Sequence, residues 1–351
     1  MPTPSKLLTI VVPTYNMEKY LRRCLDSLIV SDEQMQMLEV LVINDGSKDS
    51  SSQIAHEYQD RYPQTFRAID KENGNYGSCV NRGLDEATGK YFRLLDADDQ
   101  FDKEGLVKVL QVLATTEADM VVTPFCRIYE GKEEERHYRE RPQGIEYGKI
   151  YDASTFDFIE RGCSHLLAMH TVTYRTAILR EVNLRLQTGI SYTDTEYVYF
   201  PLRVVRRILF IDVCLYVYTC GREGQTVSPA AQIKGIKSYY TVGNRVWEDF
   251  KTQTGNKLPC PLRSSQLVMI ERVFGSYFMA NICLTKRGPE EVRMKALYED
   301  LKANAPETLA LLRTRKYRKI FHYFKIWERG KYLSEFPYSA INGLISCYKR
   351  L

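Results

Sequence analysis

The 351-residue sequence lacks any apolar run long enough for a membrane-spanning helix. Stretches such as 7–12 and 213–217 fall far short of the roughly 18 residues that cross a bilayer. The first of them follows a single positive charge and stops at Pro13, which is too short for the core of a signal peptide. We therefore expect no membrane-spanning helix and a cytoplasmic location.

The sequence also lacks Cys-x-x-Cys pairs, which many structural zinc sites and redox motifs use. Its nine cysteines are an odd number, and several of them, such as Cys24, Cys126 and Cys214, stand inside apolar segments. Reduced thiols packed in a core explain this pattern better than disulfides do. Because 44% of the residues are apolar, the chain can bury a sizeable core, which excludes a disordered or fibrous protein.

Outside the C-terminal tail, acidic residues slightly outnumber basic ones. Residues 313–351 contain ten Lys or Arg and two Glu, a net charge of +8, whereas the whole chain carries +5, so residues 1–312 carry −3. An enzyme acting on nucleic acid would place its basic residues along its main groove. The distribution therefore argues against a nucleic-acid partner and indicates that the tail meets an anionic surface.

The tail also has an apolar stripe at helical spacing, which predicts a basic amphipathic helix. Such a helix lies in the headgroup region of an anionic membrane, or it docks on the protein's own helices, and both interpretations stay open at this point. The stripe consists of Tyr317, Ile320, Phe321, Phe324 and Trp327.

The first 125 residues alternate short β-branched runs with helical apolar patterns. Alternation of this kind builds a mainly parallel sheet with helices on both faces, and ligands bind at the carboxyl ends of its strands. The pattern therefore predicts an α/β fold whose chemistry follows each strand. The predicted strands are 8–12, 39–44, 66–70, 91–95 and 119–123.

Beyond residue 125 the regular alternation of strand and helix patterns ends. The charged run at 130–141 predicts a solvated hairpin or a lid. We expect a helix over 154–162, a further helix starting near 194, and one strand over 208–219. Beyond these, apolar stripes predict the packing helices of a C-terminal bundle over 233–251, 263–286 and 290–313.

Polar, turn-forming residues follow the predicted strands. The pair Asp96 and Asp98 comes directly after the fourth strand. Two carboxylates that leave a strand on one side of an extended turn can supply oxygen ligands to a hard divalent cation, together with a diphosphate. The position of the pair after a strand carries this prediction, because the Asp-x-Asp spacing alone is common.

Three motifs resemble those of family 2 glycosyltransferases, in order and in spacing. They are IVVPTYN at 10–16, VINDGSKDS at 42–50 and LLDADD at 94–99. The likeness is close over about the first 100 residues and looser to about residue 228. It implies the GT-A fold, with a catalytic domain over 1–228 and a helical C-terminal region over 229–351 that ends in the basic tail 313–351.

The resemblance also implies roles for single residues. In such enzymes the residue matching Tyr15 stacks on the nucleobase, the one matching Asp45 binds the base edge, and Asp96 and Asp98 face the ribose and the metal-bound diphosphate. The implied metal ligands are Asp98 and Asp96, with Mn²⁺ or Mg²⁺ as the cation. Asn81 matches an Asn that the family usually carries on the helix after a Gly-rich turn. The predicted nucleotide-sugar-binding residues are Pro13, Tyr15, Asp45, Asn81, Asp96, Asp99 and Arg222.

Several of these residues also have interpretations that need no ligand. Asp45 precedes a glycine and could belong to a turn, and Asp49 could cap the helix that follows it. We expect Asp45 at the base and Asp49 at the cap. Asp99 could cap the helix that begins near Lys103, or hold sugar and acceptor hydroxyls, and Arg222 could bridge the departing diphosphate or belong to a surface loop.

The general base is predicted at Asp194. The family usually has a Glu-Asp pair here, and its Asp removes the proton of the acceptor hydroxyl. Thr193 replaces the Glu in this sequence. An Asp at a helix start is also an ordinary capping residue, and Glu196 is the fallback base.

The implied activity is inverting transfer of one sugar from a nucleotide-diphosphate sugar, a UDP-sugar, to a hydroxyl of a glycan or lipid-linked acceptor in cell-surface polysaccharide or glycan assembly. Processive synthases of the family carry membrane spans and a Gln-x-x-Arg-Trp motif, which this sequence lacks. The alternatives are a non-catalytic partner that binds nucleotide-sugar or tethers an assembly at the membrane, and a nucleotidyltransferase. If the tail binds lipid, the cytoplasmic protein is peripheral on the inner face of the membrane.

Overall fold

The computed structural model describes residues 6–138, 141–222, 225, 228–256, 260, 262–281 and 290–304. The chain divides into two compact units. The first comprises Met1–Glu223 and Pro259–Ser265, and the second comprises Gly224–Leu258 and Gln266–Leu351. The basic tail predicted at 313–351 lies outside the described residues.

The first unit is built on an eight-stranded sheet with the order β3-β2-β1-β4-β10-β6-β11-β9. Only β10 and β9 run against the direction of the other strands, which confirms the predicted mainly parallel α/β fold. The strands are β1 (Leu8–Thr14), β2 (Leu38–Asn44), β3 (Phe66–Asp70), β4 (Tyr91–Leu94), β6 (Met120–Val122), β9 (Ile150–Asp152), β10 (Val172–Arg175) and β11 (Arg207–Phe210).

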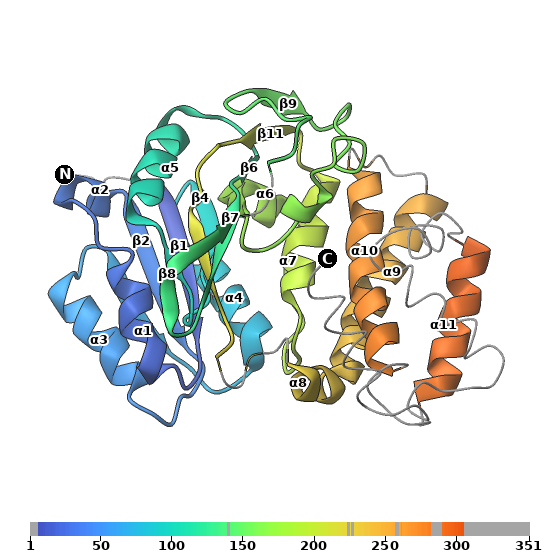
Figure 1. Cartoon of the computed structure of the whole chain (residues 1–351), viewed down its shortest axis with the longest axis horizontal. Helices are drawn as coiled ribbons and strands as arrows, with labels where there is room; N and C mark the ends of the chain where they lie inside the picture. Colours follow the sequence, from blue (N-terminus) through green and yellow to red (C-terminus); the bar gives the residue numbers. More distant parts are fainter. Residues whose placement is uncertain are drawn as a thin grey trace. The chain divides into compact units, whose positions relative to one another are not determined.

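Helices connect these strands as the apolar stripes predict. The stripe of α1 is buried at Leu21, Cys24 and Leu25, and the sheet lies between α1 and α3 on one side and α4 on the other (Figure 1). The helices of this unit are α1 (Glu18–Asp26), α2 (Asp32–Gln36), α3 (Ser51–Arg61), α4 (Asn75–Glu86), α5 (Lys103–Thr115), α6 (Thr176–Glu181) and α7 (Asp194–Tyr199), together with the start of α10.

A second, four-stranded sheet has the order β5-β12-β7-β8. Its strands are β5 (Gln100–Phe101), β12 (Tyr216–Cys220), β7 (Phe125–Tyr129) and β8 (Lys132–Tyr138). β7 and β8 form an antiparallel hairpin whose turn contains Gly131 at φ +81°. Over its described part, the charged run therefore forms the predicted hairpin.

Two predicted elements are wrong. The single strand expected over 208–219 is two strands in different sheets, because the chain turns tightly where the amide of Val213 donates to the carbonyl of Ile211. The helix expected over 154–162 is a series of turns. There, the side chains of Asp152 and Asp157 accept backbone N–H bonds at 2.6 to 3.1 Å, and such local bonds compete with helix formation.

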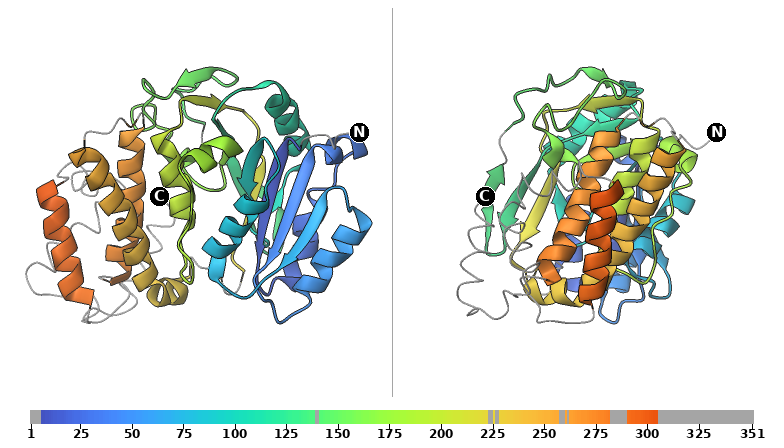
Figure 2. Two further views of the ribbon diagram at one scale, coloured as in Figure 1. Left: turned by 180° about the vertical axis from the view of Figure 1, so that it is seen from behind. Right: turned by 90° about the vertical axis from the view of Figure 1, so that its right-hand side faces the viewer.

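The second unit contains α8 (Pro229–Lys234), α9 (Ile236–Gly255), most of α10 (Arg263–Met279) and α11 (Glu290–Asn304) (Figure 2). Trp247 of α9 is fully buried and donates its indole N–H to Asp300 of α11 at 2.6 Å. The rings of Tyr240 and Tyr277 pack α9 on α10, with centroids 5.5 Å apart. Within the described residues, no helix has the length and apolar character needed to cross a membrane.

The close contact between α4 and β1 generates a stability prediction. A Cβ added at Gly83 would lie 2.5 Å from a methyl carbon of Val11, which is fully buried in the sheet. We expect Gly83→Ala to lower the free energy of unfolding by about 1–3 kcal/mol, because overpacking of this kind outweighs the helix propensity of Ala. Chemical denaturation measures the change. The matched control on the same helix is Asp85→Ala at an exposed position, and a similar loss in both variants would contradict the packing argument.

Candidate active site

The predicted site residues at the ends of β1, β2 and β4 lie at one edge of the sheet, because these strands are parallel neighbours. The loop after β1 is tied to the loop after β2. The amide of Asn16 donates to Ser47 Oγ at 3.0 Å, and the amide of Lys48 donates to Asn16 Oδ1 at 2.8 Å. Tyr15 stands beside this junction with 47% of its surface exposed, and Pro13 precedes it at the end of β1.

Asp49 has the structural role predicted for it. Its Oδ1 accepts a hydrogen bond from the amide of Ser51 at the start of α3, and its Oδ2 accepts one from Glu18 at the start of α1, both at 3.0 Å. Burial alone would raise the pKa of Asp49, but these bonds outweigh burial and hold the pKa below its ordinary value. One carboxylate thus caps two helices, and the predicted capping role is confirmed.

Asp45 is 2% exposed and binds the segment that leads into α4. Its Oδ1 accepts bonds from Lys71 Nζ at 2.5 Å and from the amide of Gly74 at 2.9 Å, while its Oδ2 accepts one from the amide of Asn75 at 2.8 Å. Because the N-cap residue Gly74 has no side chain, Asp45 supplies the acceptor for the first turn of the helix. Its contact with a nucleobase edge stays a prediction.

Asn81 lies on α4, and both polar groups of its side-chain amide bind the backbone of Leu186. The Nδ2 donates to the Leu186 carbonyl, and the Oδ1 accepts from the Leu186 amide, both at 2.8 Å. This pair of bonds ties α4 to the segment before α7. Binding of a nucleotide-sugar by Asn81 stays a prediction.

Three carboxylates follow β4 within four residues. Tyr76 donates to Asp96 Oδ1 at 3.1 Å. Asp98 is 7% exposed and forms an ion pair with Arg222.

Asp99 is fully buried, and its carboxylate accepts from the Tyr216 hydroxyl at 2.6 Å and from the Thr219 amide at 2.7 Å. Asp99 is not the cap of α5, because Asp102 has that position and accepts from the amide of Gly105.

The crowding of these acids has an electrostatic consequence. Burial, and secondly the negative charge of Asp98, raise the pKa of both Asp96 and Asp99 above the ordinary range of aspartate. Ionised carboxylates in this position need a positive charge nearby.

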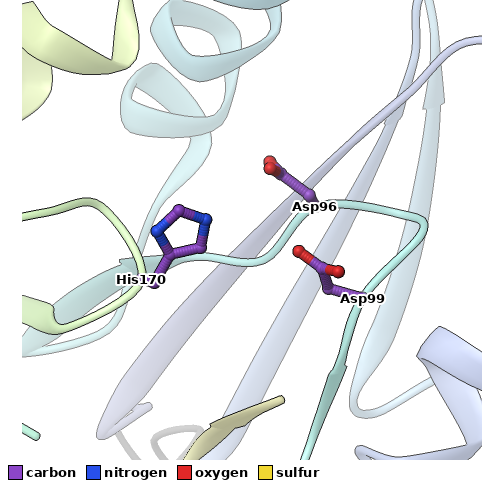
Figure 3. Close-up of side chains that lie close together, drawn as sticks. All are labelled: Asp96, Asp99 and His170. Carbon is purple, nitrogen blue, oxygen red and sulfur yellow. The ribbon is translucent and has the colours of Figure 1, made fainter. Parts of the chain in front are cut away.

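A residue that the sequence analysis missed joins this group. Side-chain ligand atoms of Asp96, Asp99 and His170 all lie within 4.8 Å of one another, and Figure 3 shows the imidazole beside the two carboxylates. Two carboxylate oxygens and one imidazole nitrogen are a donor set that suits a divalent transition metal such as Mn²⁺. The residues present therefore fit the cation that the fold family implies.

His170 is held in place by its surroundings. Its ring stacks on Phe125 with centroids 5.3 Å apart and meets the rings of Tyr216 and Tyr218 edge-on at 4.8 and 4.9 Å. Arg93 of β4 donates to the His170 carbonyl at 2.5 Å. Burial, and then the charges of Arg93 and Arg127, lower the pKa of His170 to about 3, so the imidazole is neutral and can act as a ligand. The only signal in the sequence was one histidine just before an apolar strand.

The predicted base candidates differ in accessibility. Asp194 is half-buried at the first position of α7. Burial raises its pKa above the ordinary value, although bonds from the backbone amides of Thr195 and of Asp194 itself act in the opposite direction. Glu196 is fully buried, and its Oε2 accepts from the amide of Gln187 at 2.7 Å. The charge of Asp194 contributes to raising the pKa of Asp96 and of Tyr76, so Asp194 lies near the acids after β4.

The chain is similar to proteins of known family. A profile of Glycosyl transferase family 2 matches residues 9–183. The uncharacterized glycosyltransferase MG025 of Mycoplasma genitalium is 37% identical over 133 residues, which are 37% of this chain and 43% of MG025, so the match spans less than half of that relative.

Solved structures show the same fold over a longer part of the chain. A crystal structure of S. aureus TarS 1–349 in complex with UDP-GlcNAc covers 93% of both chains at 20% identity, with a TM-score of 0.64. The mannosyltransferase PcManGT of Pyrobaculum calidifontis, in complex with GDP-Man and Mn²⁺, covers 91% of this chain and 84% of its own at 16% identity, with a TM-score of 0.50. The sequence motifs, the family match and the GT-A fold agree, and the chain belongs to the family 2 glycosyltransferases.

Proposed function

We propose that this glycosyltransferase transfers a single sugar from a UDP-sugar to a hydroxyl acceptor with inversion at the anomeric carbon. The observation that carries the proposal is the position of a half-buried acid, Asp194, near the carboxylates after β4. A base on one side and a cation-binding group on the other are what a single displacement at the anomeric carbon requires.

UDP is the nucleotide we propose, on the strength of the family and of TarS, whose structure contains UDP-GlcNAc. The exposed ring of Tyr15 offers a stacking face for the base at the end of β1. Asp45 and Lys71 form an ion pair next to the start of α4, and we propose that a base edge binds beside this pair, which contains one hydrogen-bond acceptor and one donor. Pro13, Asn81, Asp96, Asp99 and Arg222 complete the proposed nucleotide-sugar-binding set.

The proposed metal ligands are Asp96, Asp99 and His170, joined by Asp98, the residue expected from the motif. A divalent cation bound there would neutralise charge on the diphosphate leaving group. The Mn²⁺ in the PcManGT complex supports this choice of cation.

Asp194 is the proposed general base. It takes the proton of the acceptor hydroxyl while the hydroxyl oxygen forms a bond to the anomeric carbon, and the bond from that carbon to the diphosphate oxygen breaks with its electron pair on the leaving group. Glu196 stays the fallback, but its burial and its bond to Gln187 suit a structural role better.

The acceptor we propose is a hydroxyl of a glycan or lipid-linked saccharide in cell-surface polysaccharide assembly. The alternatives are a non-catalytic nucleotide-sugar-binding or membrane-tethering protein and a nucleotidyltransferase. Incubation of the purified chain with Mn²⁺ and a panel of radiolabelled UDP-sugars separates the glycosyltransferase from the non-catalytic protein, and incubation with UTP and a sugar phosphate tests for the nucleotidyltransferase. Release of labelled sugar to water or to a glycan acceptor supports the enzyme, whereas binding without release supports the non-catalytic protein.

The metal assignment generates the first prediction of this site. We expect UDP to raise the melting temperature strongly with Mn²⁺ and only weakly in chelator, because ligands stabilise the folded state in proportion to their binding. Asp96→Asn should remove most of the increase in melting temperature that UDP gains from Mn²⁺. The control variant Asp60→Asn, at an exposed position, should keep this increase. Equal stabilisation by UDP in chelator and in Mn²⁺ would rule the assignment out.

The base assignment generates the second prediction. Asp194→Asn should lower sugar transfer by about 10²- to 10⁴-fold, the usual scale for a positioned general base, with UDP and Mn²⁺ binding retained. Glu196→Gln should instead lower the melting temperature and change turnover less, because the buried carboxylate bonds to the backbone. Near-wild-type transfer by the Asp194 variant would move the base to Glu196.

The tail generates a third prediction, from its sequence alone. We propose that residues 313–351 bind anionic lipid, so the full chain should float with vesicles of phosphatidylserine at low salt and should not float with vesicles of neutral lipid. Two altered proteins should stay at the bottom of the gradient. One carries the three changes Lys316→Glu, Lys319→Glu and Lys325→Glu, and the other is truncated after Leu312. Flotation that survives the charge reversal, or its absence in the wild type, would count against membrane binding.

A further inference from the structure

Asp98 and Arg222 are bound to each other, although the family roles assign them to ligands of opposite charge. Arg222 Nε donates to Asp98 Oδ2, and the two side chains are only 13% and 10% exposed. Asp98 follows β4 and Arg222 follows β12. The Asp98 carboxylate is expected to bind the cation, and the Arg222 guanidinium is expected to bind the diphosphate. In this structure the two groups bind each other instead.

The Arg222 guanidinium also makes a cation–π contact with Tyr20. The Cζ of Arg222 lies 5.6 Å from the centroid of Tyr20, and the Tyr20 hydroxyl donates to Glu130 at 3.0 Å. Arg23 lies near the same ring, with its Cζ 5.8 Å from the Tyr20 centroid, but its Nη2 donates to the backbone carbonyl of Asp98 at 2.9 Å and to Thr219 Oγ1 at 3.1 Å. Arg23 thus holds the main chain of the acidic turn, while Arg222 binds the Asp98 carboxylate.

A buried ion pair resists losing one partner at a time, because the other is left as an uncompensated charge. A cation that arrives alone at Asp98 would displace Arg222 without offering it a new partner. A diphosphate that arrives alone would draw Arg222 away and leave Asp98 beside Asp96 and Asp99. A cation and a diphosphate that arrive together supply both missing charges.

We propose that the Asp98–Arg222 ion pair is exchanged for a cation–diphosphate pair when the donor binds, so that Arg222 makes the binding of metal and nucleotide cooperative. Arg222 holds Asp98 in the unliganded protein and turns to the diphosphate in the complex. Since coupling between two ligands is reciprocal, UDP tightens Mn²⁺ binding by the same factor by which Mn²⁺ tightens UDP binding. This inference rests on the proposed function of the site.

The test is the affinity of the full chain for Mn²⁺ alone, measured from the electron paramagnetic resonance signal of free Mn²⁺, and then the same measurement with saturating UDP. Arg222→Gln removes the competitor for Asp98, so it should bind Mn²⁺ alone about tenfold more tightly than the wild type, a typical size for such coupling. The factor by which UDP tightens Mn²⁺ binding should shrink in this variant. Unchanged or weaker binding of Mn²⁺ alone would overturn the exchange.

Two further variants separate the ion pair from a general effect of charge. Arg127→Gln removes a positive charge that acts on His170 but does not pair with Asp98, and we expect it to change the affinity for Mn²⁺ alone much less than Arg222→Gln does. Tyr20→Leu removes the ring beside Arg222 and Arg23 and keeps both cations. Because Arg23 binds the main-chain carbonyl of Asp98 and Arg222 binds its carboxylate, loss of the ring should free that carboxylate and tighten Mn²⁺ binding by a few-fold. Equal effects of Arg127→Gln and Arg222→Gln, or no effect of Tyr20→Leu, would contradict the proposal.

The two levels of the proposal fail differently. If the wild type binds neither UDP nor a UDP-sugar in the presence of Mn²⁺, the proposed function fails and the exchange fails with it. If the wild type binds UDP with Mn²⁺ and Arg222→Gln leaves the affinity for Mn²⁺ alone unchanged, the exchange alone fails.

Discussion

Repulsion among three aspartates in four residues is the constraint around which the described site is organised. Asp96, Asp98 and Asp99 leave β4 in a turn that is mostly shielded from water, where like charges interact strongly. Each carboxylate has a different partner: Tyr76 for Asp96, Arg222 for Asp98, and the Tyr216 hydroxyl with the Thr219 amide for Asp99. Three of those partners come from β12 or directly follow it, so a strand of the second sheet supplies most of the partners of the acidic turn.

The loops around the acidic turn are held by carboxylates used as helix caps. Asp49 joins the starts of α1 and α3, and Asp45 caps α4, whose N-cap residue is a glycine. Asn16 and Asn75 have positive φ angles of 53° and 67°, and the bonds around them offset the cost of that conformation. The bonds of Asn16 tie the loop after β1 to the loop after β2 next to the exposed ring of Tyr15, an arrangement that suits the stacking role we propose for it.

The residues proposed for chemistry all belong to the first unit, including Asp194 on α7 and His170 before β10. The second unit has its own buried interactions, such as the bond between Trp247 and Asp300. The part of the chain that carries the strongest positive charge, 313–351, adds a function that we propose from sequence alone.

The sequence by itself determined the features that depend on near neighbours along the chain. Strand and helix periodicity, polar strand ends and turn residues are local, and they predicted the parallel sheet, the position of the acidic motif after β4 and the cap at Asp49. Local signals failed at 154–162, where two aspartates favour turns, and at 208–219, where one apolar run serves two sheets. Only the tertiary structure decided that His170 lies beside Asp96 and Asp99, that Asp102 rather than Asp99 caps α5, and that Asp98 binds Arg222. The first and last of these join residues far apart in sequence, so their contacts depend on strand order and chain reversal, which a local pattern does not encode.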